Sequence, residues 1–97
     1  MPTIHVSAQA EADIDSIAEY TANTWGLAQT DVYLRKLEDG FEFLVRNPLM
    51  GRSCDPIQAG LRRYEVEKHV VFYRIATGGI RIVRVLHQRM LPTKPRF

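Results

Sequence analysis

The stretch from Leu61 to His87 places the tightest limit on the fold of this 97-residue chain. It contains three runs rich in Val, Ile, Tyr and Phe, the side chains that fit a pleated sheet. The runs cover residues 61–67, 69–75 and 80–87. Lys68 and the pair Gly78-Gly79 separate them, and such short Gly-containing breaks are hairpin signals. Three consecutive strands joined by tight turns predict an antiparallel meander.

The middle run is apolar on both of its faces. Side chains alternate along a strand, so Val71 and Tyr73 face one side while Val70 and Phe72 face the other. This pattern is typical of a central strand with helices packed on one side. We expect the other side to be only partly covered, which leaves an apolar strip along Val70 and Phe72 or on the opposite face of the strand. Apolar patches rimmed by charge tend to mark partner surfaces.

A first helix is predicted to begin after Ser7, whose hydroxyl is a good N-cap. Gly26 is predicted to end it, because glycine adopts the left-handed conformation that a helix C-cap favours. The apolar side chains between them recur at helical spacing, and we interpret Trp25 as a core anchor that closes the helical hairpin. The stripe consists of Ile14, Ile17, Ala18, Thr21 and Trp25.

A second helix is predicted from about Ala28 to Arg46, ending where Pro48 disfavours helical geometry at Asn47. Gly40 lies inside this helix at a cost of about 1 kcal/mol relative to Ala, so we expect another backbone to approach closely there. The connection to the first helix is short, which predicts an antiparallel helical hairpin. Its apolar face consists of Leu34, Leu37, Phe41, Leu44 and Val45.

The remaining segments complete one α+β domain over residues 1–97. Thr3 to Val6 is expected to be a strand at the edge of the meander, and residues 47–60 are expected to be a loop. Residues 88–97 form a basic tail with two prolines that argue against a helix. The predicted order is β-α-α-β-β-β, a helical hairpin packed on an antiparallel sheet.

Charge is divided unequally along the chain. Residues 1–51 carry 3 Lys or Arg and 8 Asp or Glu, a net charge of −5. Residues 52–97 carry 10 Lys or Arg and 3 Asp or Glu, a net charge of +7. Part of this asymmetry is explained if the two halves neutralise each other across the fold. The excess predicts that the C-terminal half meets an acidic partner, either nucleic acid or protein.

Several classes of function are disfavoured by the composition. Cys54 has no partner for an internal disulfide and is interpreted as a bystander thiol in a loop. His5, His69 and His87 are far apart in the sequence, so no metal site and no cofactor are expected. No apolar run approaches the roughly 18 residues that a membrane-spanning helix needs, and the N-terminus does not resemble a signal peptide. A cytoplasmic location without membrane contact is expected.

Several local strings, in this order and spacing, resemble the ParE branch of the RelE/ParE toxin superfamily. The likeness covers nearly the whole chain. The strings are Ala10–Asp15, Trp25-Gly26, Asn47–Gly51, Gly60–Arg63, His69–Arg74 and Arg84–Met90.

The resemblance implies the toxin of a bacterial type II toxin-antitoxin pair with the RelE/ParE-like fold. It implies a ParD-like antitoxin whose C-terminal segment wraps the toxin. It also implies DNA gyrase as the target, through its A subunit, with inhibition by binding instead of catalysis. RelE-like relatives on the same fold cut messenger RNA in the ribosome, and a fold alone does not separate the two activities.

The residues for RNA cleavage form an incomplete set. Metal-free cleavage needs a base, an acid and cations that stabilise the phosphate. If the chain is a nuclease, Arg62 and Arg84 hold the phosphate and His87 moves the proton, because histidine titrates near neutral pH. Nucleases of the superfamily often carry a His-Tyr or similar pair after the last strand, where this chain has Gln88-Arg89-Met90. We therefore favour a non-catalytic inhibitor, with a ribosome-dependent endoribonuclease of RelE type as the alternative.

Arginines on or just beyond the strands are the candidates for binding the antitoxin or the target. Arginine pairs bidentately with carboxylate or phosphate. In the alternative interpretation, Arg74 and Arg84 form ion pairs with the acidic helices and His87 is a structural histidine. A third interpretation is a generic nucleic-acid-binding module, although the aromatic side chains do not form an interleaved stacking platform. The candidates are Arg62, Arg63, Arg74, Arg81, Arg84 and Arg89.

Overall fold

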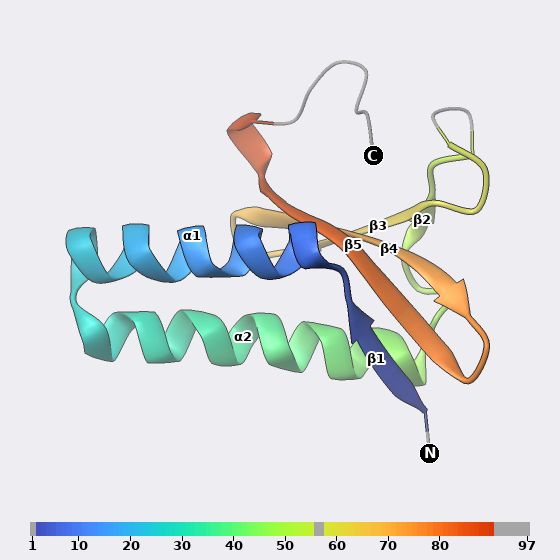
Figure 1. Cartoon of the computed structure of the whole chain (residues 1–97), viewed down its shortest axis with the longest axis horizontal. Helices are drawn as coiled ribbons and strands as arrows, with labels where there is room; N and C mark the ends of the chain where they lie inside the picture. Colours follow the sequence, from blue (N-terminus) through green and yellow to red (C-terminus); the bar gives the residue numbers. More distant parts are fainter. Residues whose placement is uncertain (1, 56–57, 91–97) are drawn as a thin grey trace.

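The computed structural model describes residues 2–55 and 58–90, which form two helices and a five-stranded sheet (Figure 1). Both helices lie together against the sheet and run antiparallel to each other (Figure 1). The elements are β1 (Thr3–Val6), α1 (Ala8–Trp25), α2 (Leu27–Arg46), β2 (Arg52–Ser53), β3 (Arg62–Val66), β4 (His69–Ala76), β5 (Gly79–His87) and the 3-10 helix η1 (Gln88–Met90).

The sheet has the strand order β1-β5-β4-β3-β2. The predicted meander is confirmed, because β3, β4 and β5 pair antiparallel in sequence and β4 is the central strand. The α+β fold class is confirmed as well. Strand β1 lies at the predicted edge but pairs parallel with β5, so the sheet is mixed and not wholly antiparallel. The predicted loop over residues 47–60 contains a short strand, β2, that pairs with β3.

The helix boundaries follow the capping residues in the sequence. The Ser7 hydroxyl oxygen accepts a hydrogen bond from the Ala10 N–H at 3.0 Å, as predicted for the N-cap of α1. Gly26 ends α1, with its N–H bonded to the Ala22 carbonyl at 3.0 Å. Its φ of 89° and ψ of 170° have the positive φ that favours glycine, but they differ from the predicted left-handed helical conformation. Helix α2 begins at the next residue.

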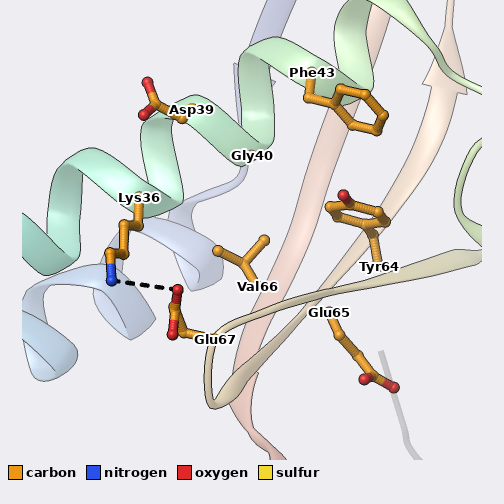
Figure 2. A pocket seen from close by; sticks show the side chains of 8 residues that line it. All are labelled: Lys36, Asp39, Gly40, Phe43, Tyr64, Glu65, Val66 and Glu67. Carbon is orange, nitrogen blue, oxygen red and sulfur yellow. Dashed lines mark ion pairs between the residues drawn. The ribbon is translucent and has the colours of Figure 1, made fainter.

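Two predictions about the helices need correction. Trp25 is 69% exposed, so it is not a core anchor, because the hairpin turn projects beyond the sheet (Figure 1). At Gly40 the close neighbour is a side chain and not a backbone. A Cβ added there would lie 2.7 Å from Cγ2 of Val66, which points from β3 toward α2 (Figure 2).

The sheet has a hydrophobic core on each face. The larger core lies under the helices, and it includes the predicted apolar face of α2 apart from Leu34, which is half-buried. Its buried members are Ala10, Ile17, Leu37, Phe41, Leu44, Val45, Val71, Tyr73, Ile80, Ile82 and Val85.

The smaller core lies on the other face, which we call the helix-free face. It contains Val70 and Phe72 of β4 with Leu61 and Cys54. Val70 is 1% exposed and Phe72 is 2% exposed, so the predicted apolar strip does not exist at these residues. Cys54 is a packed core residue, and burial raises the pKa of its thiol.

Tyr73 ties the loop after α2 to the centre of the sheet. Its hydroxyl donates to the Pro48 carbonyl at 2.7 Å and accepts from the Gly51 N–H at 2.8 Å. The side chain is fully buried, so both bonds are shielded from water. One phenol therefore fixes the path of the chain between α2 and β2.

None of the helices in the described ranges is long and apolar enough to cross a membrane. The predicted tail begins with η1, which is a short helical turn where we expected none. Residues 91–97 of that tail, with Pro92 and Pro95, lie outside the described residues.

Replacing Tyr73 by Phe is expected to lower the free energy of unfolding by about 1–3 kcal/mol, because the buried Gly51 N–H and the partly buried Pro48 carbonyl lose their partner. Urea denaturation followed by circular dichroism measures this change. Tyr20→Phe is the control, since the Tyr20 ring is exposed and its variant is expected to unfold like the parent. Equal stability of the two variants would contradict this role of the Tyr73 hydroxyl.

Candidate functional site

The six candidate arginines do not form one cluster. Arg62 lies opposite Tyr73, on the face that the helices cover. Its guanidinium donates to the Gly51 carbonyl at 2.7 Å and contacts the Leu49 carbonyl at 3.5 Å. Arg62 therefore supports, through its Nη1, the same loop that Tyr73 holds.

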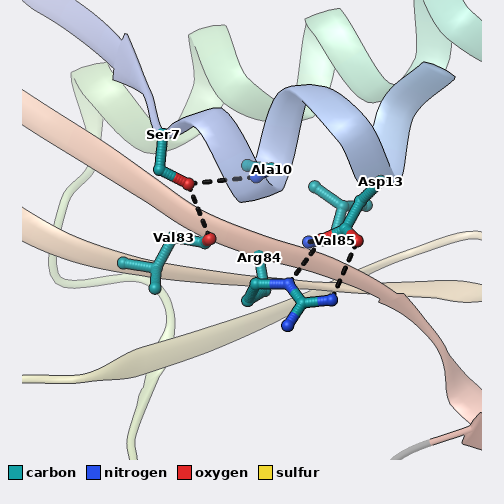
Figure 3. A network of polar contacts seen from close by, with 6 residues as sticks. All are labelled: Ser7, Ala10, Asp13, Val83, Arg84 and Val85. Atoms are coloured by element: carbon teal, nitrogen blue, oxygen red, sulfur yellow. Dashed lines mark hydrogen bonds and ion pairs between the residues drawn. The ribbon is translucent and has the colours of Figure 1, made fainter. Parts of the chain in front are cut away.

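Arg84 is held by the first helix. Its Nε donates to Asp13 Oδ2 at 2.8 Å and its Nη2 donates to Asp13 Oδ1 at 2.9 Å, a bidentate ion pair (Figure 3). The Val85 N–H also donates to Asp13 Oδ2, at 3.0 Å. The side chains are only 25% and 14% exposed, and the hydrogen bond to Asp13 raises the pKa of Arg84. The structural interpretation of Arg84 is confirmed.

A β-bulge directly precedes Arg84 on β5. Phe72 pairs with Arg84 and Tyr73 pairs with Ile82, so Val83 is the extra residue on β5. A bulge shifts the direction of the side chains that follow it. The Val83 carbonyl accepts from the Ser7 hydroxyl at 2.8 Å, which joins the bulge to the start of α1 (Figure 3). The adjacent apolar residues Ile82 and Val83 break strict alternation and were the sequence signal for this bulge.

Arg74 and Arg81 are directly opposed on β4 and β5, and they share the helix-free face with Phe72. Arg74 donates to the Ala59 carbonyl, so the predicted ion pair with a helix acid is wrong for this residue. The side chain of Arg81 is exposed and makes no hydrogen bond or ion pair among the described residues. His5 of β1 lies on its other side, in parallel register. Like charges placed opposite each other destabilise a sheet, so this pair favours an anion from outside.

Arg63 is the second cation with unused donors on the helix-free face. Its guanidinium lies 5.8 Å from the centroid of the Phe72 ring and 3.9 Å from Glu65. Glu65 also pairs with Arg52 at 3.0 Å, so its carboxylate is shared. The Nε atom of Arg63 is buried without a hydrogen-bond partner. Such an unsatisfied donor raises the free energy of the unliganded chain.

His87 lies at the other end of β5, beside η1. Its ring meets the His69 ring edge-on with centroids 5.1 Å apart, and its Nδ1 accepts from the Arg89 N–H at 3.1 Å. The Arg89 side chain is exposed. The structure therefore gives His87 the contacts of a structural histidine.

His69, at the start of β4 beside His87, has a strongly shifted pKa. Its Nδ1 and the Tyr33 hydroxyl form a hydrogen bond, and the two rings are 5.4 Å apart. Burial, with a smaller effect from His87, lowers the pKa of His69 to about 4. The ring is neutral at pH 7. Sequence reasoning did not predict this Tyr-His-His cluster, because its members come from distant parts of the chain.

The three residues named for a nuclease do not converge. Arg62 lies opposite Tyr73 and His87 lies opposite His69, four residues apart on β4. At the usual rise per residue, four residues separate them by about 13 Å along the strand. Arg84 is meanwhile bound to Asp13. The described residues also contain no group of three or more His, Cys, Asp or Glu placed to hold a metal ion.

The family model described as "ParE toxin of type II toxin-antitoxin system, parDE" matches residues 4–92. The chain belongs to this ParE toxin family. Toxin ParE1 of Mycobacterium tuberculosis is 41% identical over 86 residues, which cover 88% of each chain. Toxin ParE1 of Caulobacter vibrioides is 39% identical over 90 residues, which cover 93% of each chain. The resemblance inferred from the local strings is therefore confirmed.

Two solved structures share the fold of this ParE-family chain. One is described as a chromosomal ParDE TA system from P. aeruginosa, with a TM-score of 0.74 and 22% identity over 90% of this chain and 96% of that one. The other is a DinJ-YafQ complex of E. coli, with a TM-score of 0.68 and 17% identity over 94% of this chain and 98% of that one. At these identities the two matches support the fold only.

Replacing Asp13 by Asn is expected to lower the free energy of unfolding of this ParE-family chain by about 2 kcal/mol, because a largely buried charge loses its counter-ion. Asp15→Asn is the control, since Asp15 is exposed on the same helix and its loss should change stability by less than about 0.5 kcal/mol. Urea titration measures both values. An Asp13→Asn variant as stable as the parent would show that Arg84 is not held by this pair.

The low pKa of His69 predicts acid sensitivity. The folded pKa is about 4 and the ordinary value is 6.5, so the unfolded chain binds the extra proton first as the pH falls. The neutral His69 ring makes its full contribution to the free energy of unfolding above pH 6.5. That contribution is lost as the pH falls toward 4, by at most about 3 kcal/mol. Unfolding free energies of the parent and of His69→Gln, measured between pH 7 and pH 4, test this. Parallel pH curves for the two proteins would contradict it, and His5→Gln is the control for an exposed ring.

Proposed function

We propose that this ParE-family toxin inhibits DNA gyrase by binding its A subunit, and that a ParD-like antitoxin neutralises it. The observation that carries the proposal is the division among the arginines. The guanidinium groups of Arg62, Arg74 and Arg84 make hydrogen bonds within the chain, whereas those of Arg63, Arg81 and Arg89 make none among the described residues.

The helix-free face suits an acidic protein segment. Arg81 stands exposed beside Arg74, and Arg63 has an unsatisfied Nε on the same face. A carboxylate placed between such guanidinium groups forms charge-assisted hydrogen bonds and relieves their mutual repulsion. These features support an antitoxin segment that carries Asp or Glu at this face. They do not require the antitoxin to contact the helices.

Within residues 2–55 and 58–90 the named acid-base residues are not assembled, which supports binding over catalysis. The phosphate-binding roles suggested for Arg62 and Arg84 conflict with their contacts to Gly51 and Asp13. His87 faces His69 and the start of η1, away from the exposed arginine at Arg81. The gyrase target itself rests on the family resemblance.

A gyrase assay tests the proposed activity. Purified toxin is expected to inhibit supercoiling and to promote gyrase-dependent DNA cleavage at micromolar concentration, while translated messages stay intact in primer extension. Cuts in messages on translating ribosomes, with supercoiling unaffected, would establish the RelE-type alternative instead.

Arg81→Glu is expected to raise the Kd for the antitoxin by about tenfold or more, because an attractive charge on the helix-free face becomes repulsive. The new carboxylate faces Arg74, so the variant is expected to fold normally. Arg35→Glu is the matched control, since Arg35 is exposed on α2 and makes no ion pair among the described residues. Isothermal titration calorimetry measures both Kd values, and equal values would contradict the assignment of this face.

A further inference from the structure

The helix-free face carries a row of basic side chains that crosses all five strands of the sheet. Arg81 of β5 lies between His5 of β1 and Arg74 of β4, and each of the two is directly opposite it in register. Arg63 of β3 lies one diagonal step from Arg74, and Arg52 of β2 is opposite Arg63. Directly paired residues project to the same face of a sheet. We call the set the basic row: His5, Arg81, Arg74, Arg63 and Arg52.

The length of the basic row fits a nucleic-acid backbone. Neighbouring strands lie about 4.8 Å apart, so the row extends over about 19 Å from β1 to β2. Duplex DNA carries one phosphate per about 3.4 Å of axis on each strand, so this length faces about five phosphates of one strand. An extended peptide would match the row only with Asp or Glu at nearly every second position. A phosphate backbone supplies the charges whatever its sequence.

Little negative charge compensates the basic row. Among the described residues the five strands contain a single acidic residue, Glu65. Its carboxylate is shared between Arg52 at 3.0 Å and Arg63 at 3.9 Å. The Arg52 side chain is still 73% exposed, and Arg81 and His5 are exposed as well. The face therefore presents a net positive charge to solvent, which attracts a polyanion.

The centre of the face gives a partner almost no apolar contact. Val70 and Phe72 are only 1% and 2% exposed. The exposed Tyr, Trp and Phe side chains of the described residues, Tyr20, Trp25 and Phe43, lie on the helices. A single-stranded nucleic acid needs aromatic side chains on which its bases stack. Binding at this face must come from charge, which favours the backbone of a duplex.

Two guanidinium groups of the row are already held in position. Arg74 donates to the Ala59 carbonyl through its Nη1, and Arg63 lies 5.8 Å from the centroid of the Phe72 ring. The Arg63 Nε has no hydrogen-bond partner, and Arg81 makes no hydrogen bond or ion pair among the described residues. Donors held in place lose less side-chain entropy when a ligand binds. The row is therefore prepared for an anionic ligand.

We propose that the basic row binds the phosphate backbone of duplex DNA without sequence preference. The choice of DNA over duplex RNA rests on the proposed function, because a toxin bound to gyrase lies beside the DNA that gyrase holds. Carboxylates and phosphates compete for the same guanidinium groups. An acidic antitoxin segment on this face therefore excludes DNA, which adds a second way for the antitoxin to neutralise the toxin.

Fluorescence anisotropy of a labelled DNA duplex of about 20 base pairs, titrated with the purified full-length chain, tests the proposal. With about three phosphate contacts, the affinity is expected to fall about 40-fold between about 50 mM and 200 mM salt. Arg81→Gln is expected to weaken binding about tenfold at the lower salt concentration and to reduce the salt slope by about one. Arg35→Gln is the matched control, because Arg35 is exposed on α2, and no change in either value is expected.

Glu65→Gln is expected to change the affinity in the opposite direction. The variant removes the single carboxylate of the strands and releases Arg52 and Arg63 for phosphate. DNA binding is expected to tighten about tenfold, with a salt slope steeper by about one. A variant that merely disturbed the fold would not bind more tightly. Circular dichroism checks that all three variants fold.

The outcomes separate this inference from the proposed function. Absence of salt-dependent DNA binding, or equal Kd values for the parent and Arg81→Gln, would overturn the inference, and the proposed function would stand if supercoiling is still inhibited. Duplex RNA or single-stranded DNA bound more tightly than duplex DNA would also overturn it. Salt-dependent DNA binding by a chain that leaves supercoiling unaffected would overturn the proposed function and leave the DNA contact standing.

Discussion

The burial of β4 on both faces is the constraint on which the rest of the structure depends. Val71 and Tyr73 require cover on one side of the sheet, and Val70 and Phe72 require it on the other. The helical hairpin supplies the first cover. Leu61 and Cys54 supply part of the second, so the helix-free face is closed at its centre and its functional groups lie around that centre.

This arrangement gives the arginines two different roles. A guanidinium that points toward the helices or their loops finds a carboxylate or carbonyl, as Arg84 does at Asp13. The unequal charge of the two halves is thus partly neutralised within the fold. On the helix-free face, Arg81 lies opposite Arg74, which is bound to the Ala59 carbonyl, and Arg63 lies against the Phe72 ring with Glu65 at 3.9 Å. The surplus positive charge is therefore concentrated where a partner can reach it.

The sequence predicted the features that depend on local pattern. The three meander strands, the Ser7 cap and the apolar face of α2 follow from alternation, capping and helical spacing, which neighbouring residues determine. The parallel pairing of β1 could not be predicted in this way, because it depends on contacts between distant segments, whereas the bulge at Val83 had a local signal that was not interpreted. Trp25 was misread for the same reason, since helical spacing does not show that the hairpin turn extends beyond the sheet.

The candidate site was predicted by residue type but not by arrangement. All six arginines lie on or beside the strands as expected, yet only the structure separates those that hold the fold from those with free donors. The hollow that Gly40, Phe43 and Tyr64 line between α2 and β3 gave no signal, because its residues belong to different elements and none stands in a motif.

The central claim is that this division of the arginines determines where a partner binds. Arginine side-chain Nε–Hε NMR signals of the labelled toxin, recorded with and without antitoxin, test it most directly. The account predicts that the signals of Arg63 and Arg81 shift on binding while that of Arg84 keeps its position. A complex in which the Arg84 signal moves and those of Arg63 and Arg81 do not would contradict it.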